Sequence, residues 1–255
     1  MSAAATDSDD SRMSLIEHLT ELRDRLIKIV LAVVIGMVVA FALYDQIFDF
    51  LLQPYLDECT SSVSDCKLLA LDPLEGFGVR MKLATYGGIF LAMPVILWQL
   101  WRFITPGLYA HEKRYAVPFM VSALTLFLLG AGIAYYTLPQ ALSFLQQIGG
   151  DNIATAYAPG KYFKLISYMM LAFGVGFEFP IVLVFAQMLG AVNPDQLRRV
   201  RRYAWVGICV LVAVITPSGD PISMVALSGP MVVFYEISIL IGRVLQRRKQ
   251  ASATA

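Results

Sequence analysis

Long apolar runs separated by short polar segments form the main pattern of this 255-residue chain. A helix crosses the roughly 30 Å hydrocarbon core of a bilayer with about 20 residues, at a rise of about 1.5 Å per residue. Four runs have this length, and the first reaches it if flanking residues are added. The fifth, at about 14 residues, spans only about 21 Å. The pattern predicts an all-α integral membrane protein with six transmembrane helices, at about 27–44, 83–103, 115–138, 162–189, 203–216 and 222–241.

The polar segments at the two ends define the remaining organisation. Residues 1–13 are small, polar and acidic, which predicts a disordered tail. Ser14 and Glu17 form a capping-box pattern, so we expect an amphipathic helix to begin there and to continue into the first span. The membrane domain then covers 14–243, and 244–255 form a cytoplasmic carboxyl-terminal tail.

Two segments between the spans carry local structural signals. Segment 45–79 is acidic and too long for a simple turn, so we expect short helices in it. After the fifth run, Pro217 ends the helix, Asp220 is a candidate N-cap, and Pro221 is a candidate first residue of the last helix.

Composition and charge support a membrane environment and limit the classes of function. Hydrophobic residues make up 58% of the chain and charged residues only 15%, well below the quarter that is typical of soluble domains. With the amino terminus inside, 15 of the 20 Lys and Arg residues fall on the inner side. The positive-inside rule then predicts a multi-pass protein of the cytoplasmic (inner) membrane with both termini in the cytoplasm. No phosphate-binding glycine loop or basic tract with interleaved aromatics indicates a nucleotide or nucleic-acid partner.

Histidine and cysteine indicate neither catalysis nor a metal site. His18 and His111 lie at the aqueous ends of predicted helices, so no histidine inside a span can activate a nucleophile. We therefore expect no enzyme activity, no metal and no cofactor. Cys59 and Cys66 share one polar loop, where a disulfide and two free thiols are both open alternatives.

Two glutamates lie within apolar runs, where a carboxylate is costly. Glu178 precedes Pro180, whose missing N–H frees the carbonyl of Gly176 and predicts a kink. Glu178 is either a polar contact for another chain or transport path, or a hydrogen-bonded structural carboxyl. Glu236 lies nearer the inner end, and a paired interfacial carboxylate is its simpler interpretation.

An alternative function also starts from these two glutamates. Glu178 and Glu236 could form the relay of a proton-coupled small-molecule or ion transporter. The chain shows no internal repeat and no series of polar residues across several spans, and both are typical of that class.

Glu21 and Glu112 both lie on the predicted cytoplasmic side. Since a carboxylate can hold a guanidinium by two hydrogen bonds, two such carboxylates could bind two neighbouring arginines of a ligand. The alternative is local pairing, of Glu21 with Arg25 one turn along the helix and of Glu112 with its basic neighbours.

Four motifs then occur in order between about Ser14 and Arg243. They are H-L-T-E-L-R-D-R-L at 18–26, F-I-T-P-G-L-Y at 103–109 with H-E-K-R at 111–114, F-G-V-G-F-E-F-P at 173–180, and Thr216-Pro217 followed by Asp220-Pro221. Together they resemble the motifs of the TatC family, the receptor subunits of twin-arginine protein translocases. The resemblance extends over all six predicted spans.

The resemblance implies a fold and a function. The fold is a glove-shaped bundle with a concave face. The function is to bind paired-arginine signal peptides of folded proteins and to nucleate a translocation complex with single-span TatA- and TatB-type subunits, in homo- and hetero-oligomers. The short fifth and sixth spans match the thin edge where these partners dock. Transport would use the membrane potential or the proton gradient, without covalent chemistry.

The resemblance also implies roles for individual residues on the inner side and within the membrane. Glu21 and Glu112 match the carboxylates that contact the signal, and Gln99 and Phe103 match inner-face positions of the same region. Glu178 matches a glutamate buried in the membrane.

On the outer side, Pro54 matches a proline of the first outer loop, and Asp220 matches the acidic residue of the last outer turn. Met224 departs from the pattern, because some family members carry a glutamine there. If that glutamine contacts a partner helix, Ser223 or Thr216 would have to substitute for it here.

Overall fold

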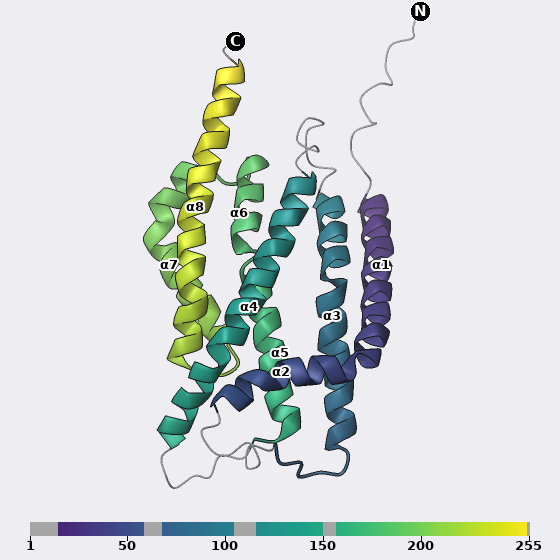
Figure 1. The fold of residues 1–255 in the computed structure, drawn as a ribbon. Coiled ribbons are helices and arrows are strands. Elements are labelled where there is room, and N and C mark those ends of the chain that lie inside the picture. The colour runs from purple at the N-terminus through teal and green to yellow at the C-terminus, as the bar shows by residue number, and fades with distance from the viewer. Residues whose placement is uncertain (1–14, 59–67, 105–115, 150–156, 254–255) are drawn as a thin grey trace, which may run out of the picture.

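The computed structural model describes residues 15–58, 68–104, 116–149 and 157–253. Within these residues all regular secondary structure is helical, which confirms the all-α fold class. The predicted tail at 1–13 lies outside the described residues. The helices are α1 (Leu15–Ala42), α2 (Tyr44–Glu58), α3 (Glu75–Ile104), α4 (Ala116–Gly149), α5 (Pro159–Gly176), α6 (Phe179–Met188), α7 (Pro194–Ile215) and α8 (Pro221–Ala253) (Figure 1).

The long helices form an up-and-down bundle. The chain runs down α1, up α3, down α4, up α5 and α6, down α7 and up α8 (Figure 1). α1 packs on α3 at one edge of the bundle, and α7 packs on α8 at the other. The amino end of α1 and the carboxyl end of α8 share one end, which we call the upper end after its place in Figure 1.

Five stretches of the described residues are long and apolar enough to cross a membrane: Leu19–Ala42, Glu75–Phe103, Val117–Gly149, Pro159–Met188 and Pro221–Gln246. Their outward faces are apolar, as with Val30, Val34 and Val38, which are exposed along α1. Because water would solvate such a surface poorly, this is a multi-pass membrane protein.

α7 matches the short fifth run. Its first half carries the exposed residues Arg198, Arg199, Arg201 and Arg202, so only its second half, 203–215, is apolar. α7 is therefore not one of the five stretches that are long and apolar enough to cross a membrane. That α7 forms the fifth predicted span stays a prediction.

α1 and α3 approach closely because two glycines face each other. A Cβ atom added at Gly36 would lie 2.5 Å from the carbonyl oxygen of Gly88, and one added at Gly88 would lie 2.6 Å from the backbone nitrogen of Met37. Neither position has room for a side chain. Since lipid provides no hydrophobic drive for helix association, such close backbone packing is a main source of attraction between spans.

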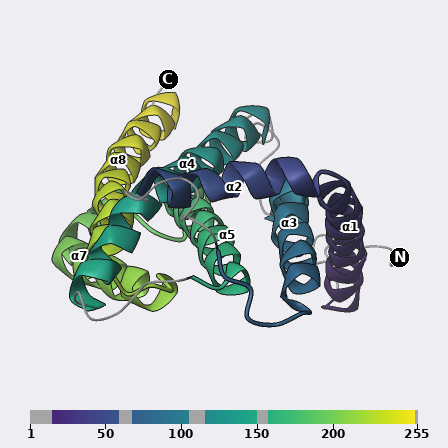
Figure 2. The ribbon, with the colours of Figure 1, turned by 60° about the horizontal axis from the view of Figure 1, so that its bottom comes forward.

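α2 confirms the expected short helix after the first span, and it lies across the lower end of the bundle from α1 toward α4 (Figure 2). Pro54 within α2 has no N–H, which leaves the carbonyl of Phe50 without its helical donor. The hydroxyl of Tyr135 on α4 donates to that carbonyl at 2.9 Å, and the hydroxyl of Tyr162 on α5 donates to the next one, Leu51, at 2.7 Å. Pro54 thus has a structural role, because it frees the carbonyl that Tyr135 binds. The two tyrosine hydroxyls together hold α2 against the bundle.

The fourth apolar run forms two helices, with a break where the kink was predicted. α5 ends at Gly176, whose carbonyl would need the missing N–H of Pro180, and α6 begins at Phe179. In the turn between them, the N–H of Glu178 donates to the carbonyl of Val175 at 3.1 Å. The break places Glu178 where the helix changes course.

The substitution Gly88→Leu tests the contact between α1 and α3. Because the new side chain would meet the backbone of α1, we expect it to lower the stability of the purified protein in detergent by about 1–3 kcal/mol. Gly132→Leu is the matched control, since a Cβ atom there meets nothing within 4 Å. Thermal unfolding midpoints of the two variants measure the difference, and equal midpoints would contradict the proposed role of the glycine pair.

Candidate functional site

Two of the predicted signal-contacting residues, Glu21 and Gln99, meet at the upper end through Arg25. One guanidinium nitrogen of Arg25, Nη2, donates to Glu21 Oε1, and Nη1 donates to the backbone carbonyl of Gln99 at 3.4 Å. The Glu21 and Arg25 side chains are 24% and 12% exposed. The local pairing of Glu21 with Arg25 is thus present, and it connects α1 to α3. We call Glu21, Arg25 and Gln99 the upper cluster.

Phe103 and Glu112 complete the predicted inner-side set. Phe103 is half-buried near the carboxyl end of α3. Two residues before it, Trp101 packs against Phe119 of α4 and Phe185 of α6, with ring centroids 4.6 and 5.4 Å apart. Glu112 lies outside the described residues, so the paired-carboxylate site stays a prediction.

Glu178 lines a cavity of about 940 Å³ within the bundle. The walls come from α3, α4, α5, α6, α7 and α8, and they are otherwise largely apolar, with Met93, Phe119 and Leu227 among them. Oε1 of Glu178 is buried and has no hydrogen-bond partner among the described residues. A structural carboxyl would be expected to have such a partner, because burying one without it costs free energy. The geometry therefore favours a polar contact for a ligand or partner chain in this cavity.

Glu236 has the paired interfacial arrangement that the sequence favours. Arg201 of α7 forms a salt bridge to Glu236 Oε1 at 2.9 Å, and the indole N–H of Trp205 donates to the same oxygen at 3.2 Å. Glu236 is absent from the residues that line the cavity of Glu178. This cavity therefore does not join the two glutamates into a proton relay.

Asp220 caps α8, as predicted. Its Oδ1 accepts the backbone N–H of Ser223 at 2.6 Å, and Ser218 donates its hydroxyl to the other carboxylate oxygen. Asp220 is 1% exposed, so this charge is held by the turn and by the amino end of the helix. Gly219 permits the tight turn, because its φ of +59° suits a residue without a side chain.

Near this turn, two hydroxyl groups are buried without a described partner. Thr216 is 5% exposed and Ser223 is fully buried, and neither side-chain oxygen has a hydrogen-bond partner among the described residues. Met224 is half-buried and packs on the apolar core. These two hydroxyls are the polar groups that remain next to Met224.

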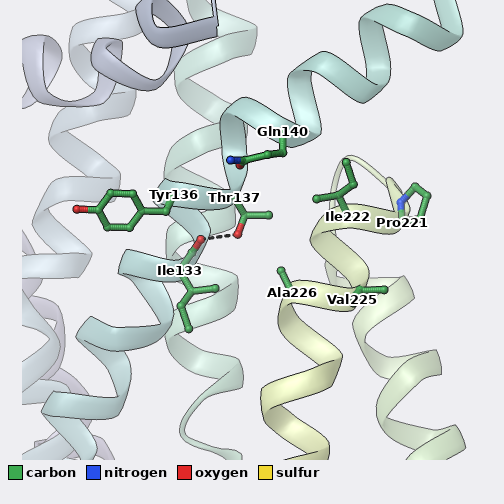
Figure 3. Close-up of a pocket in the computed structure, with 8 residues that line it drawn as sticks. All are labelled: Ile133, Tyr136, Thr137, Gln140, Pro221, Ile222, Val225 and Ala226. Carbon is green, nitrogen blue, oxygen red and sulfur yellow. Dashed lines mark hydrogen bonds between the residues drawn. The ribbon is translucent and has the colours of Figure 1, made fainter.

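A second hollow, of about 710 Å³, opens between α4 and α8 (Figure 3). It is lined by residues within 133–140 and 221–226, and Val225 and Ala226 contribute apolar walls. The hydroxyl of Thr137 donates to the carbonyl of Ile133 at 2.7 Å, so its proton is not available to a ligand there. The hollow suits an apolar chain better than a polar solute.

A polar network at the lower end was not predicted from the sequence. Glu75 accepts the backbone N–H of Gly160 at 3.0 Å and that of Leu71 at 3.0 Å, and Lys82 donates to the carbonyl of Gly160 at 3.2 Å. The carboxylate therefore stabilises the amino end of α5. The sequence signal was present, since Pro159 begins a helix that has no side-chain cap of its own.

The cysteines add no site within the described part of the chain. Cys59 and Cys66 lie outside it, so their pairing stays open, and Cys209 is free and exposed on α7. Among the described residues, no group of three or more His, Cys, Asp or Glu side chains could hold a metal ion.

The fold and the cavity together define a class: an all-helical, multi-pass membrane protein with a buried carboxyl in an apolar cavity between its spans. Residues 17–230 match the family described as Sec-independent protein translocase protein (TatC). The chain belongs to the TatC family.

Individual relatives and solved structures agree with this assignment. The chain is 39% identical over 248 residues to the Sec-independent protein translocase protein TatC of Frankia casuarinae, covering 94% of this chain and 68% of that protein. It is 39% identical over 241 residues to the TatC of Aquifex aeolicus, covering 93% and 98%. A crystal structure described as the twin arginine translocase receptor TatC matches with a TM-score of 0.74 and 38% identity, over 89% of this chain and 99% of that one. These similarities support a protein translocase over the transporter alternative.

A matched pair of substitutions tests the assignment of Glu178 as an unpartnered carboxyl. Glu178→Leu removes a buried group that lacks a described partner, so we expect the stability in detergent to rise by about 1–3 kcal/mol. Glu75→Leu removes a carboxylate that accepts two backbone N–H bonds, so we expect stability to fall. Thermal unfolding of both variants measures these changes. A loss of stability in Glu178→Leu as large as in Glu75→Leu would show that Glu178 is a structural carboxyl.

Proposed function

We propose that this chain is the core receptor subunit of a twin-arginine translocase. It binds paired-arginine signal peptides of folded proteins at the cytoplasmic face and then assembles with single-span TatA- and TatB-type subunits, as homo- and hetero-oligomers. The observation that carries the proposal is its similarity, at 38% identity over 89% of the chain, to a solved structure described as the twin arginine translocase receptor. It acts as a receptor rather than as an enzyme.

The orientation follows from charge. The upper end holds the start of α1 and the arginine-rich first half of α7, and it is the cytoplasmic end by the positive-inside rule. Both termini then lie in the cytoplasm, and α2 lies at the outer surface of the cytoplasmic membrane. α7 is the fifth of the six spans, and its short apolar half thins the bilayer beside it.

The signal arginines bind at the upper end. Glu21 and Glu112 hold them through charge-assisted hydrogen bonds, with Gln99 and Phe103 beside the bound segment. The position of Glu21 supports this role, because its side chain is part-exposed at the upper end and its Oε2 has no hydrogen-bond partner among the described residues.

The apolar part of the signal then enters the membrane along the cavity of about 940 Å³. Its apolar walls suit an apolar helix, and Glu178 supplies one polar contact within them for the signal or a partner subunit. The partner helices dock beside α7 and α8, next to the turn that buries Thr216, Asp220 and Ser223. The membrane potential or the proton gradient drives transport.

Photo-crosslinking tests the carboxylate site. A twin-arginine signal peptide with a photoreactive residue beside its arginines should crosslink to this chain in membranes. We expect Glu21→Ala combined with Glu112→Ala to reduce crosslinking about tenfold or more, because the arginines lose charge-assisted hydrogen bonds. Asp195→Ala, which removes an exposed carboxylate from the first turn of α7, is the matched control. Undiminished crosslinking to a double variant that accumulates normally would refute the site.

A further inference from the structure

The Glu21 carboxylate already has a cation of its own. Arg25 follows it by one helical turn, so the backbone of α1 holds the two side chains together. The other terminal nitrogen of Arg25, Nη1, donates to the backbone carbonyl of Gln99 on α3. Next to this pair along α1, Arg23 and Asp24 form a salt bridge with each other at 3.1 Å. A ligand that reaches Glu21 therefore meets an ion pair with no net charge.

The upper cluster nevertheless retains open acceptors. Oε2 of Glu21 and Oε1 of Gln99 are both buried, and neither has a hydrogen-bond partner among the described residues. Gln99 itself is 8% exposed, so its side-chain amide is held in the protein. Buried acceptors without donors cost free energy, which a ligand with suitable donors would recover. The two oxygens belong to residues of α1 and α3 that Arg25 links, and each of them can accept an N–H of a ligand.

A neutral site with two open acceptors discriminates between arginine and lysine. A guanidinium is planar, weakly hydrated and presents its N–H groups as a rigid fork, whereas an ammonium is a compact and strongly hydrated point charge. Binding of a lysine side chain depends on net negative charge in the site, which compensates for the hydration that the ammonium loses. Binding of an arginine side chain depends more on the geometry of its hydrogen bonds.

We infer that Arg25 makes the Glu21 site selective for arginine over lysine, because it neutralises the carboxylate, so that a ligand is held by hydrogen bonds to the open acceptors rather than by net charge. This inference rests on the proposed binding of signal arginines at Glu21. Arg25 is a positioning residue in this account, since it acts on the ligand through Glu21 and Gln99. Its removal would leave a lone carboxylate, which attracts either cation.

The experiment measures two dissociation constants for each variant. The full chain is purified with its partner subunits in nanodiscs of zwitterionic lipid, and fluorescence anisotropy gives Kd for a signal peptide with two arginines and for the same peptide with two lysines. We expect Arg25→Gln to lower the ratio of the lysine Kd to the arginine Kd about fivefold or more, mainly through tighter binding of the lysine peptide. Arg25→Lys keeps the neutralising charge and should keep most of the selectivity. Lys28→Gln, which removes an exposed charge three residues further along α1, is the matched control.

The outcomes separate this inference from the function on which it rests. An unchanged ratio in Arg25→Gln overturns the inference, as does an equal loss of both affinities in Arg25→Gln and Arg25→Lys, which a purely structural role would produce. Glu21→Gln tests the proposed function separately, because undiminished binding of the arginine peptide would refute the Glu21 site itself.

If Arg25→Gln does not fold, Glu112→Ala, which removes the second proposed carboxylate, still decides the inference. Binding of the arginine peptide to this variant should weaken only about twofold when salt rises from 0.1 to 1 M, a change that shortens the Debye length from about 10 to about 3 Å. A much steeper loss would contradict neutralisation by Arg25.

Discussion

A hydrocarbon solvent offers no hydrogen bonds, and this constraint governs the structure. Every polar group that a span exposes must find a partner within the protein. The proline in α2 illustrates the consequence, because Pro54 frees the carbonyl of Phe50 and the hydroxyl of Tyr135 donates a hydrogen bond to that carbonyl. The same rule explains why Asp220 caps α8 within a buried turn and why Glu236 is paired with Arg201. The scaffold is thus a set of helices whose polar groups are matched locally.

The candidate functional positions are those where this matching is incomplete. Glu178 stands in a helix break with one buried oxygen unpartnered among the described residues, inside an otherwise largely apolar cavity. Glu21 and Gln99 likewise keep one open acceptor each at the upper end. A protein tolerates such unsatisfied groups where a ligand or another chain completes them. The first position suits a helix passing through the bilayer, and the second suits a cationic segment arriving from water.

Local features of this chain could be predicted from sequence, whereas contacts between helices could not. The apolar runs, the kink before Pro180 and the N-cap at Asp220 follow from hydropathy and from the chemistry of single residues. Hydropathy marks only the apolar part of a helix, so α4 continues to Gly149, well past the predicted end of its span at 138. The crosswise course of α2 and the link from Arg25 to Gln99 depend on distant partners such as Tyr135 and on the Gly36–Gly88 contact. The residue pattern of a single helix does not indicate which distant residues that helix will contact.

The most direct test of the central claim is export by this chain in a cell. A strain that lacks its own TatC would receive this chain together with the single-span subunits of the same organism, and a folded reporter with a twin-arginine signal would be followed across the membrane. We expect the reporter to be exported in its folded state, and we expect replacement of the two signal arginines to abolish export. Export that is absent although the chain and its partners accumulate in the membrane, or that is indifferent to the arginine pair, would contradict the central claim.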